Sequence, residues 1–251
     1  MKHLRIFNSM EEFEAVKSSI DTPFVVLEEG TGDVIYSNLI EITEDDITSG
    51  DYVDLGLPSG LKWATCNVGA TSPCEYGLLY QFGRVDGYAY GDTNHKFRKG
   101  EVDTYTPNTT SGKKYFNYDV LGKEDDAAYV ASNGAMRMPK KAEMEELLAN
   151  TTNEWVSCSV MGGEHTSHNV MGRLFTSKTD SSKKLFLPAT GNFNGVSRSF
   201  MNAGSASAYW CSSVHYTNTS GDILLCNSSN CQLFYIQKYT GNPIRGIKID
   251  K

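Results

Sequence analysis

The sequence predicts an α+β protein in two parts. A small helix-plus-hairpin module over residues 1–48 precedes a larger domain of short strands, with one or two helices, over residues 50–251. Three observations support this prediction. An acidic stretch that is poor in apolar residues separates the two parts. After it, β-branched and aromatic residues recur in short runs between glycine turns, as in strands. One later stretch has apolar residues at clear helical spacing.

The N-terminal module is predicted from one helical pattern and one hairpin pattern. Apolar residues have helical spacing over residues 10–20. Two β-branched runs then flank the glycine-rich turn at residues 30–33, which predicts a β-hairpin. A module this small has a thin core, so we expect it to dock onto a partner or onto another copy of the chain. Residues 41–51 are interpreted as a linker.

The larger domain begins with a second predicted hairpin, which turns at residues 58–60 and carries Val53 and Trp63 on its two strands. Residues 83–126 are polar and show little periodicity, which predicts an irregular region. A helix follows, with Pro139 in its first turn and a buried stripe of Met144, Leu147 and Leu148. Further strands are predicted at residues 155–156, 173–176 and 185–187.

The bulk composition excludes some classes of partner. The formal net charge is −7, whereas a nucleic-acid surface needs clustered Lys and Arg to neutralise phosphates. We therefore expect no nucleic-acid partner. No run approaches the roughly 18 to 20 apolar residues that span a bilayer. The acidic residues near the N-terminus do not fit a signal peptide, so we expect a soluble chain without membrane insertion.

The six cysteines show no zinc-finger spacing and no CxxC pair. Cys66 with Cys74, and Cys226 with Cys231, are each close enough in sequence to close a short loop. Unpaired thiols are the favoured interpretation of both pairs, and disulfides are the alternative.

Signatures of catalysis and of metal binding are mostly absent. Residues 30–32 lack the third glycine of a phosphate-binding loop, and no GxSxG or HExxH motif occurs. Glu164, His165 and His168 are close in sequence, but the glycines and hydroxyl residues around them favour an ordinary polar loop over a metal site. Residues 124–126 are interpreted as a solvated acidic turn rather than a calcium site. We expect no enzymatic activity, no metal and no cofactor.

The composition of the C-terminal third indicates a binding surface. From Leu187 onward, runs of Asn, Ser, Thr and Tyr alternate with single apolar or glycine positions. Tyr provides rigid amphipathic contact area, while Ser, Asn and Gly provide adaptable hydrogen bonding, as in antibody binding loops. The alternative is an ordinary surface in which tyrosines anchor strands.

Several segments resemble the Fibrobacter-type major paralogous domain. They are YVDLGLPSGLKWATCNVGA, the Met138-Pro139 pair with the charged helix and Trp155, LFLPATG, YWCSS and the closing GNPIRGIK, in the family's order over residues 50–251. That family is related to the formylglycine-generating-enzyme branch of the C-type-lectin fold, so the resemblance implies a C-type-lectin-like domain. The copper-binding cysteine pair of the enzymes in that branch has no match here, which argues against an oxidase.

Several proteins with this domain are variable proteins of diversity-generating retroelements, whose C-terminal codons are rewritten at adenines. The resemblance implies that residues 192–242 form such a diversified face, because many of them can be reached from an Asn codon. Some cysteines of this segment are then accidental products of diversification. Gln232, Gln237 and Lys238 need other codons, which weakens the case. Trp210 also cannot be reached from an Asn codon, which suits a fixed residue that anchors the core.

The resemblance implies a non-enzymatic protein that recognises a host-surface protein or glycan. The implied setting is a phage tail or receptor-binding protein on the virion, attached to a virion component or oligomerised through residues 1–48, where avidity strengthens weak single sites. The alternative is a bacterial cell-surface or secreted adhesion domain with a structural role and no diversified face.

We expect the ligand contacts to come from polar and aromatic side chains that point outward. They are Asn194, Ser197, Arg198, Tyr209, His215, Tyr216, Asn218, Asp222, Asn227, Phe234, Tyr235 and Tyr239. Trp210, Leu225 and residues 246–249 are expected to form the scaffold, because a variable surface needs strands that pack independently of it.

Overall fold

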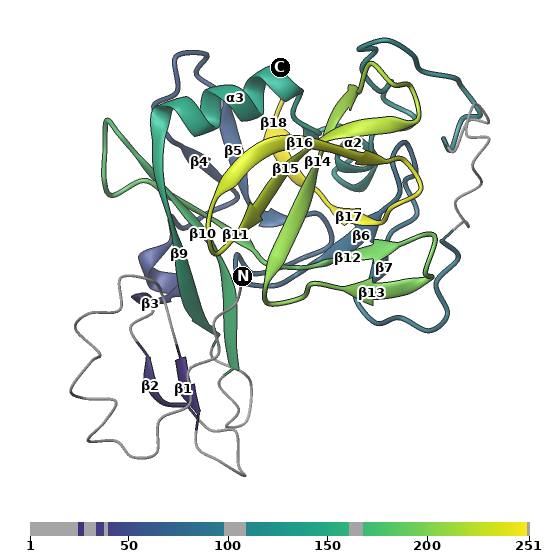
Figure 1. Ribbon diagram of the computed structural model, residues 1–251. Helices are drawn as coiled ribbons and strands as arrows, with labels where there is room; N and C mark the ends of the chain where they lie inside the picture. The colour runs from purple at the N-terminus through teal and green to yellow at the C-terminus, as the bar shows by residue number, and fades with distance from the viewer. Residues whose placement is uncertain (1–24, 28–33, 38–39, 98–108, 161–167, 250–251) are drawn as a thin grey trace. The chain divides into compact units, whose positions relative to one another are not determined.

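The structure is a computed structural model (Figure 1). It describes residues 25–27, 34–37, 40–97, 109–160 and 168–249. The chain divides into two compact units, Met1–Ile40 and Glu41–Lys251. In the first unit, β1 (Val25–Leu27) pairs antiparallel with β2 (Val34–Ser37), which confirms the predicted hairpin. The turn at residues 30–33 and the helix predicted over residues 10–20 lie outside the described residues.

The second unit is mostly β-sheet, with two α-helices among its described residues, and is α+β-like. The helices are α2 (Ala127–Ala131) and α3 (Lys141–Asn150), and η2 (Glu44–Asp46) is a 3-10 turn. The strands that follow the hairpin are β3 (Ile40–Thr43), β4 (Tyr52–Asp54), β5 (Lys62–Asn67), β6 (Leu78–Tyr80), β7 (Tyr88–Ala89), β8 (Met136–Arg137), β9 (Thr151–Val160), β10 (His168–Ser177), β11 (Lys184–Pro188), β12 (Asn192–Asn194), β13 (Ser199–Met201), β14 (Ala206–Val214), β15 (Ser220–Asn227), β16 (Cys231–Gln237), β17 (Asn242–Pro243) and β18 (Arg245–Lys248).

These elements confirm most of the predicted strands. β4 and β5 form the second predicted hairpin, in which Val53 pairs with Trp63. The three later predictions fall within β9, β10 and β11. In the region predicted to be irregular, residues 83–126, the described part contains one short strand, β7.

The main core lies where three sheets and α3 meet. The sheets have the strand orders β11-β10-β9-β3, β4-β5-β18-β8 and β14-β15-β16. Trp63, Phe175 and Tyr209, one from each sheet, are fully buried in one cluster with Leu147 of α3. Burial of such large side chains is the main stabilising contribution to a fold of this kind.

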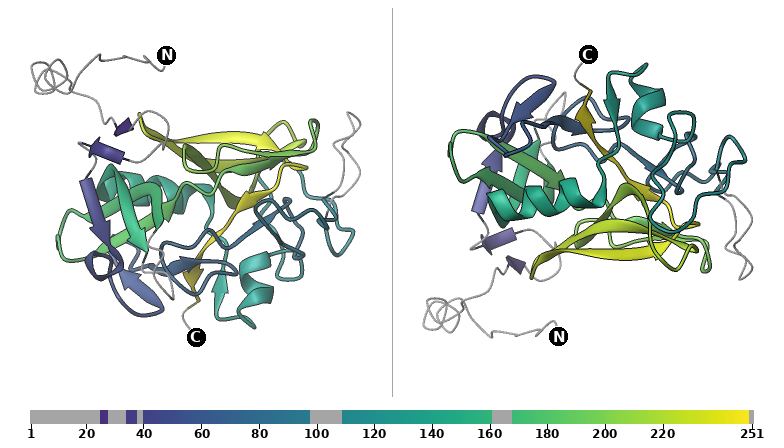
Figure 2. Two further views of the ribbon diagram at one scale, coloured as in Figure 1. Left: turned by 90° about the horizontal axis from the view of Figure 1, so that it is seen from below. Right: turned by 90° about the horizontal axis from the view of Figure 1, so that it is seen from above.

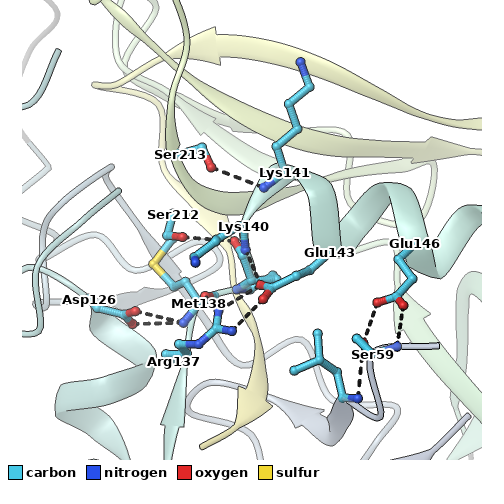
Figure 3. Close-up of polar contacts among 12 residues, drawn as sticks. Ser59, Asp126, Arg137, Met138, Lys140, Lys141, Glu143, Glu146, Ser212 and Ser213 are labelled. Carbon is cyan, nitrogen blue, oxygen red and sulfur yellow. Dashed lines mark hydrogen bonds and ion pairs between the residues drawn. The ribbon is translucent and has the colours of Figure 1, made fainter. Parts of the chain in front are cut away.

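Helix α3 confirms the predicted helix but starts later than expected. It begins at Lys141, because the Glu143 carboxylate accepts hydrogen bonds from the Lys140 amide at 2.7 Å and from the Arg137 guanidinium at 2.8 and 2.5 Å (Figure 3). These contacts fix the first turn. Pro139, predicted within that turn, precedes the helix.

The inner face of α3 follows the predicted stripe. Met144 and Leu147 are fully buried, and Leu148 packs against the same cluster while partly exposed. On another face, the Glu146 carboxylate accepts from the Ser59 amide at 2.7 Å and from its hydroxyl at 2.6 Å (Figure 3). Helix α3 is therefore tied to the turn of the β4–β5 hairpin.

The linker predicted over residues 41–51 is wrong. Ile42 and Ile47 are buried in a cluster with Val156 and Phe186. The acidic residues between them form the exposed 3-10 turn η2. The stretch looked like a linker because it has few apolar residues, but those few are buried, and the second unit starts at residue 41.

The solvated acidic turn predicted at residues 124–126 is also wrong. The Asp125 side chain is fully buried and accepts hydrogen bonds from the Ser111 amide and hydroxyl, at 2.7 and 2.5 Å, and from the Tyr115 hydroxyl at 2.9 Å. Asp126 caps α2 and accepts from the Met138 amide at 2.9 Å. Because donors satisfy both carboxylates, burial is tolerated.

Two disulfides correct the expectation of free thiols. Cys226 pairs with Cys231, and Cys74 pairs with Cys158, 84 residues away in sequence. Cys66, the partner considered for Cys74, has a free thiol. Sequence spacing identified only the short loop, because the longer link depends on how β9 packs against the loop that holds Cys74.

Candidate functional site

The sheet β14-β15-β16 carries the candidate site, and it lies along one side of the second unit in both views of Figure 2. Trp210, Ile223 and Phe234 stand in one row across its three strands. Tyr209 and Leu224, in the next row, point to the opposite face and pack against α3. Both faces of β14 and β15 are largely buried, so side chains reach solvent mainly from β16 and from the ends of the sheet.

Four rings form a continuous row of contacts at the end of this sheet, which we call the aromatic row. His215 stacks on Tyr235 with ring centroids 3.9 Å apart, and Tyr235 stacks on Phe234 at 5.0 Å. Tyr216 lies 4.3 Å from His215. Tyr216, Phe234 and Tyr235 are 58%, 50% and 38% exposed, while His215 is buried. The row thus presents three large rings to solvent on a support that holds them in place.

A pocket of about 320 Å³ opens beside the aromatic row. Side chains from all three strands make its apolar wall, namely Ala208, Ile223, Leu225, Phe234 and Ile236. Polar amides complete it, and those of Asn192 and Asn202 are joined by a hydrogen bond of 3.0 Å. Its volume is at the lower end of the range for small-ligand pockets, and an apolar wall with a few fixed polar groups is their usual composition.

Asp222 lies directly opposite Tyr235 in the ladder, next to the aromatic row. It is 1% exposed, and neither carboxylate oxygen has a hydrogen-bond partner among the described residues. The Lys141 ammonium is 4.0 Å from one oxygen. Burial raises the pKa of Asp222, and Lys141 and His215 oppose that rise. Burial lowers the pKa of His215, and the charge of Asp222 opposes that shift.

The structure divides the predicted contact residues into three groups. The exposed ones are Ser197, Arg198, Tyr216, Phe234 and Tyr235, the partly exposed ones are Asn194, Asn218, Asn227 and Tyr239, and the buried ones are Tyr209, His215 and Asp222. The aromatic row unites His215, Tyr216, Phe234 and Tyr235, with Asp222 beside it. Asn194, Ser197 and Arg198 lie apart from the row, on the β12–β13 hairpin.

Tyr209, His215 and Asp222 do not point outward as predicted. Tyr209 is a core residue, whose hydroxyl donates to the Pro188 carbonyl at 2.8 Å and accepts from Asn67 at 3.2 Å. The prediction used the polar and aromatic composition of the segment, which carries no information on what packs over each strand. It fails because α3 covers the face that Tyr209 and Asp222 share, while His215 is covered by Tyr235 and Tyr216.

The partly exposed asparagines mainly build turns. The Asn194 side-chain oxygen accepts from the amides of residues 196 and 197, and that of Asn227 accepts from the amides of residues 229 and 230. Asn218 has φ of 64°, and its side chain accepts from the Asn117 amide at 2.7 Å. These side chains serve as local turn formers, which composition alone does not distinguish from contact residues.

The predicted scaffold holds in part. Trp210, Gly246 and Ile247 are buried, whereas residues 248 and 249 are partly exposed. Leu225 is also partly exposed and lines the pocket, so it belongs to the site. Sequence reasoning also missed Asn192 and Asn202, because only the β12–β13 pairing places these two amides together.

The described residues contain no group of three or more His, Cys, Asp or Glu side chains suited to hold a metal ion. Glu164 and His165 lie outside the described residues, and His168 starts β10. In the described part of the chain, no helix has the length and hydropathy needed to cross a bilayer. Comparisons with protein-family models, with curated proteins and with solved structures found no match to this chain.

Proposed function

We propose that this chain is a non-enzymatic recognition protein that binds a host-surface protein or glycan through the aromatic row and the adjoining pocket. One observation carries the proposal. Three large rings remain exposed while joined by ring contacts, because buried His215 stacks on Tyr235, Tyr235 stacks on Phe234, and Tyr216 lies against His215. Exposed, fixed aromatic rings lose little conformational entropy on binding, and such residues dominate the energetics of interfaces.

The segments that resemble the Fibrobacter-type major paralogous domain support the finer proposal of a C-type-lectin-like fold. The proposed site falls within residues 192–242, where that resemblance implies a diversified face. A phage tail or other virion location, with attachment through the N-terminal unit, follows from the same resemblance. A bacterial cell-surface or secreted adhesion domain without diversification is the alternative. Sequencing the neighbouring DNA separates the two, because a diversified gene lies near a reverse transcriptase and a near-identical template repeat.

The binding surface is tested with glycan arrays and arrays of bacterial surface proteins, probed with the purified full chain. Phe234→Ala and Tyr216→Ala should each reduce the binding free energy of a captured ligand by about 2 kcal/mol, the usual effect at an aromatic anchor. Val130→Ala is the matched control, because Val130 is an exposed apolar residue on α2, outside residues 192–242. A ligand that binds all three variants like the wild type would place recognition elsewhere.

A further inference from the structure

Strand β16 is the outer strand of its sheet (Figure 1). Its residues, Cys231–Gln237, pair with β15 along their whole length, without a register shift. No further strand pairs with its outer side among the described residues.

The two ends of the ladder show which backbone groups face outward. Cys226 and Cys231 are opposite each other with Cα atoms 4.1 Å apart, the spacing of a non-hydrogen-bonded pair. At the other end, the Lys238 amide donates to the Thr219 carbonyl at 3.1 Å, as in a hydrogen-bonded pair. These two types of pair alternate along an antiparallel ladder.

The alternation therefore turns the backbone groups of Leu233 and Tyr235 away from β15, while those of Phe234 point toward it. No other described residue forms a backbone hydrogen bond with Leu233 or Tyr235. Their N–H and C=O groups form an open edge with the spacing that an added strand requires.

This edge also lacks the features that usually prevent pairing. Edge strands are normally blunted by charges, prolines or bulges. Residues 231–237 contain no charged residue and no proline, and the ladder has no bulge. Phe234, exposed on this strand, lines the pocket, so the open edge and the pocket adjoin.

We propose that β16 binds an extended polypeptide segment of the ligand as an additional strand, with one apolar side chain of that segment in the pocket. This deepens the proposed function and rests on it. Main-chain pairing would supply affinity, and the pocket would supply specificity at alternate residues. A second copy, paired through its own β16, is the other occupant to be tested, and the oligomeric state distinguishes it from a ligand segment.

The test starts from a displayed library of random decapeptides selected against the full chain. An enriched peptide is synthesised, and its affinity is measured for Tyr235→Ala and Tyr235→Pro. Both variants lose the ring, but only proline removes the outward N–H. An edge strand tolerates proline at such a position, so the fold should be kept. We expect Tyr235→Pro to bind at least about tenfold more weakly than Tyr235→Ala, the consequence of blocking the approach of a strand. Leu225→Trp, which fills the pocket, should also weaken binding.

Hydrogen exchange on the wild type gives a second readout that needs no variant. The amides of Leu233 and Tyr235 should exchange fast in the free protein and slowly with the peptide bound. Equal affinity of the two Tyr235 variants, or unchanged exchange at these amides, would overturn the proposal. So would a failure to enrich any peptide, or a wild-type dimer that Tyr235→Pro dissociates. A glycan lost on Phe234→Ala but bound equally by both Tyr235 variants would retain the proposed function and refute strand addition.

Discussion

Two aromatic residues of the same row allow a direct comparison of scaffold and display positions. Trp210 and Phe234 flank Ile223 in one row of the sheet, so their side chains share a face. Trp210 is fully buried, whereas Phe234 is half exposed. Truncating each to alanine removes an aromatic ring from the same sheet, in two different environments.

The expected costs follow from the contacts. Trp210 donates its indole N–H to the Tyr80 carbonyl at 2.7 Å and packs edge-to-face with Phe82, with centroids 5.3 Å apart. Truncation of a buried Trp costs about 3 to 5 kcal/mol, and the unpaired carbonyl adds about 1 kcal/mol or more. Phe234→Ala loses only half of a full burial contribution, or about 1 kcal/mol.

Thermal melts at neutral pH check these values. For a domain of this size, 1 kcal/mol shifts the Tm by about 2 to 4 °C. Trp210→Ala should therefore lower the Tm by about 10 °C or more, and Phe234→Ala by only about 2 to 4 °C. If Phe234→Ala unfolds as readily as Trp210→Ala, Phe234 is a core residue. The proposed display surface would then lose its main physical support.

Three further predictions concern charge, redox state and the unit boundary. Because burial raises the folded-state pKa of Asp222 above its unfolded value, the ionised carboxylate destabilises the fold at neutral pH. Asp222→Asn should thus raise the Tm at neutral pH, and the gain should shrink as the pH falls toward about 4 in a series of melts. A reductant should lower the Tm, and Cys74→Ser should reproduce most of the drop, because the disulfide with Cys158 closes a loop that is worth about 4.5 kcal/mol in the chain-entropy model. A drop below about 5 °C would contradict this. Residues 41–251 should melt cooperatively when expressed alone. Residues 50–251 should melt several degrees lower, because the two buried isoleucines of residues 41–49 are lost. Equal melting temperatures would show that the domain starts at residue 50.

The sequence predicted elements whose signal is local. The β4–β5 hairpin and helix α3 have turn residues and apolar spacing that do not depend on the rest of the chain. The burial of Ile42 and the link between Cys74 and Cys158 depend on partners more than 80 residues away, so no local pattern reveals them.

The candidate site shows the same limit. Tyr216 and Phe234 were predicted to be exposed, and they are. Tyr209 and Asp222 were predicted to be exposed from the same composition of the segment, yet helix α3 covers their face of the sheet. The packing of a helix from the middle of the chain decides their burial, and composition of the C-terminal third contains no information on it.

The disulfide between Cys226 and Cys231 has a consequence for how this surface tolerates sequence change. It joins two residues that lie opposite each other beside the turn of the β15–β16 hairpin. A slip of one residue in pairing would exchange the two faces of β16, so that Phe234 and Tyr235 would each point to the opposite face. The covalent link forbids that slip. Successive substitutions on β16 can therefore change the side chain at each position while the direction in which it points stays the same. The surface can change its chemistry without a change in the strand.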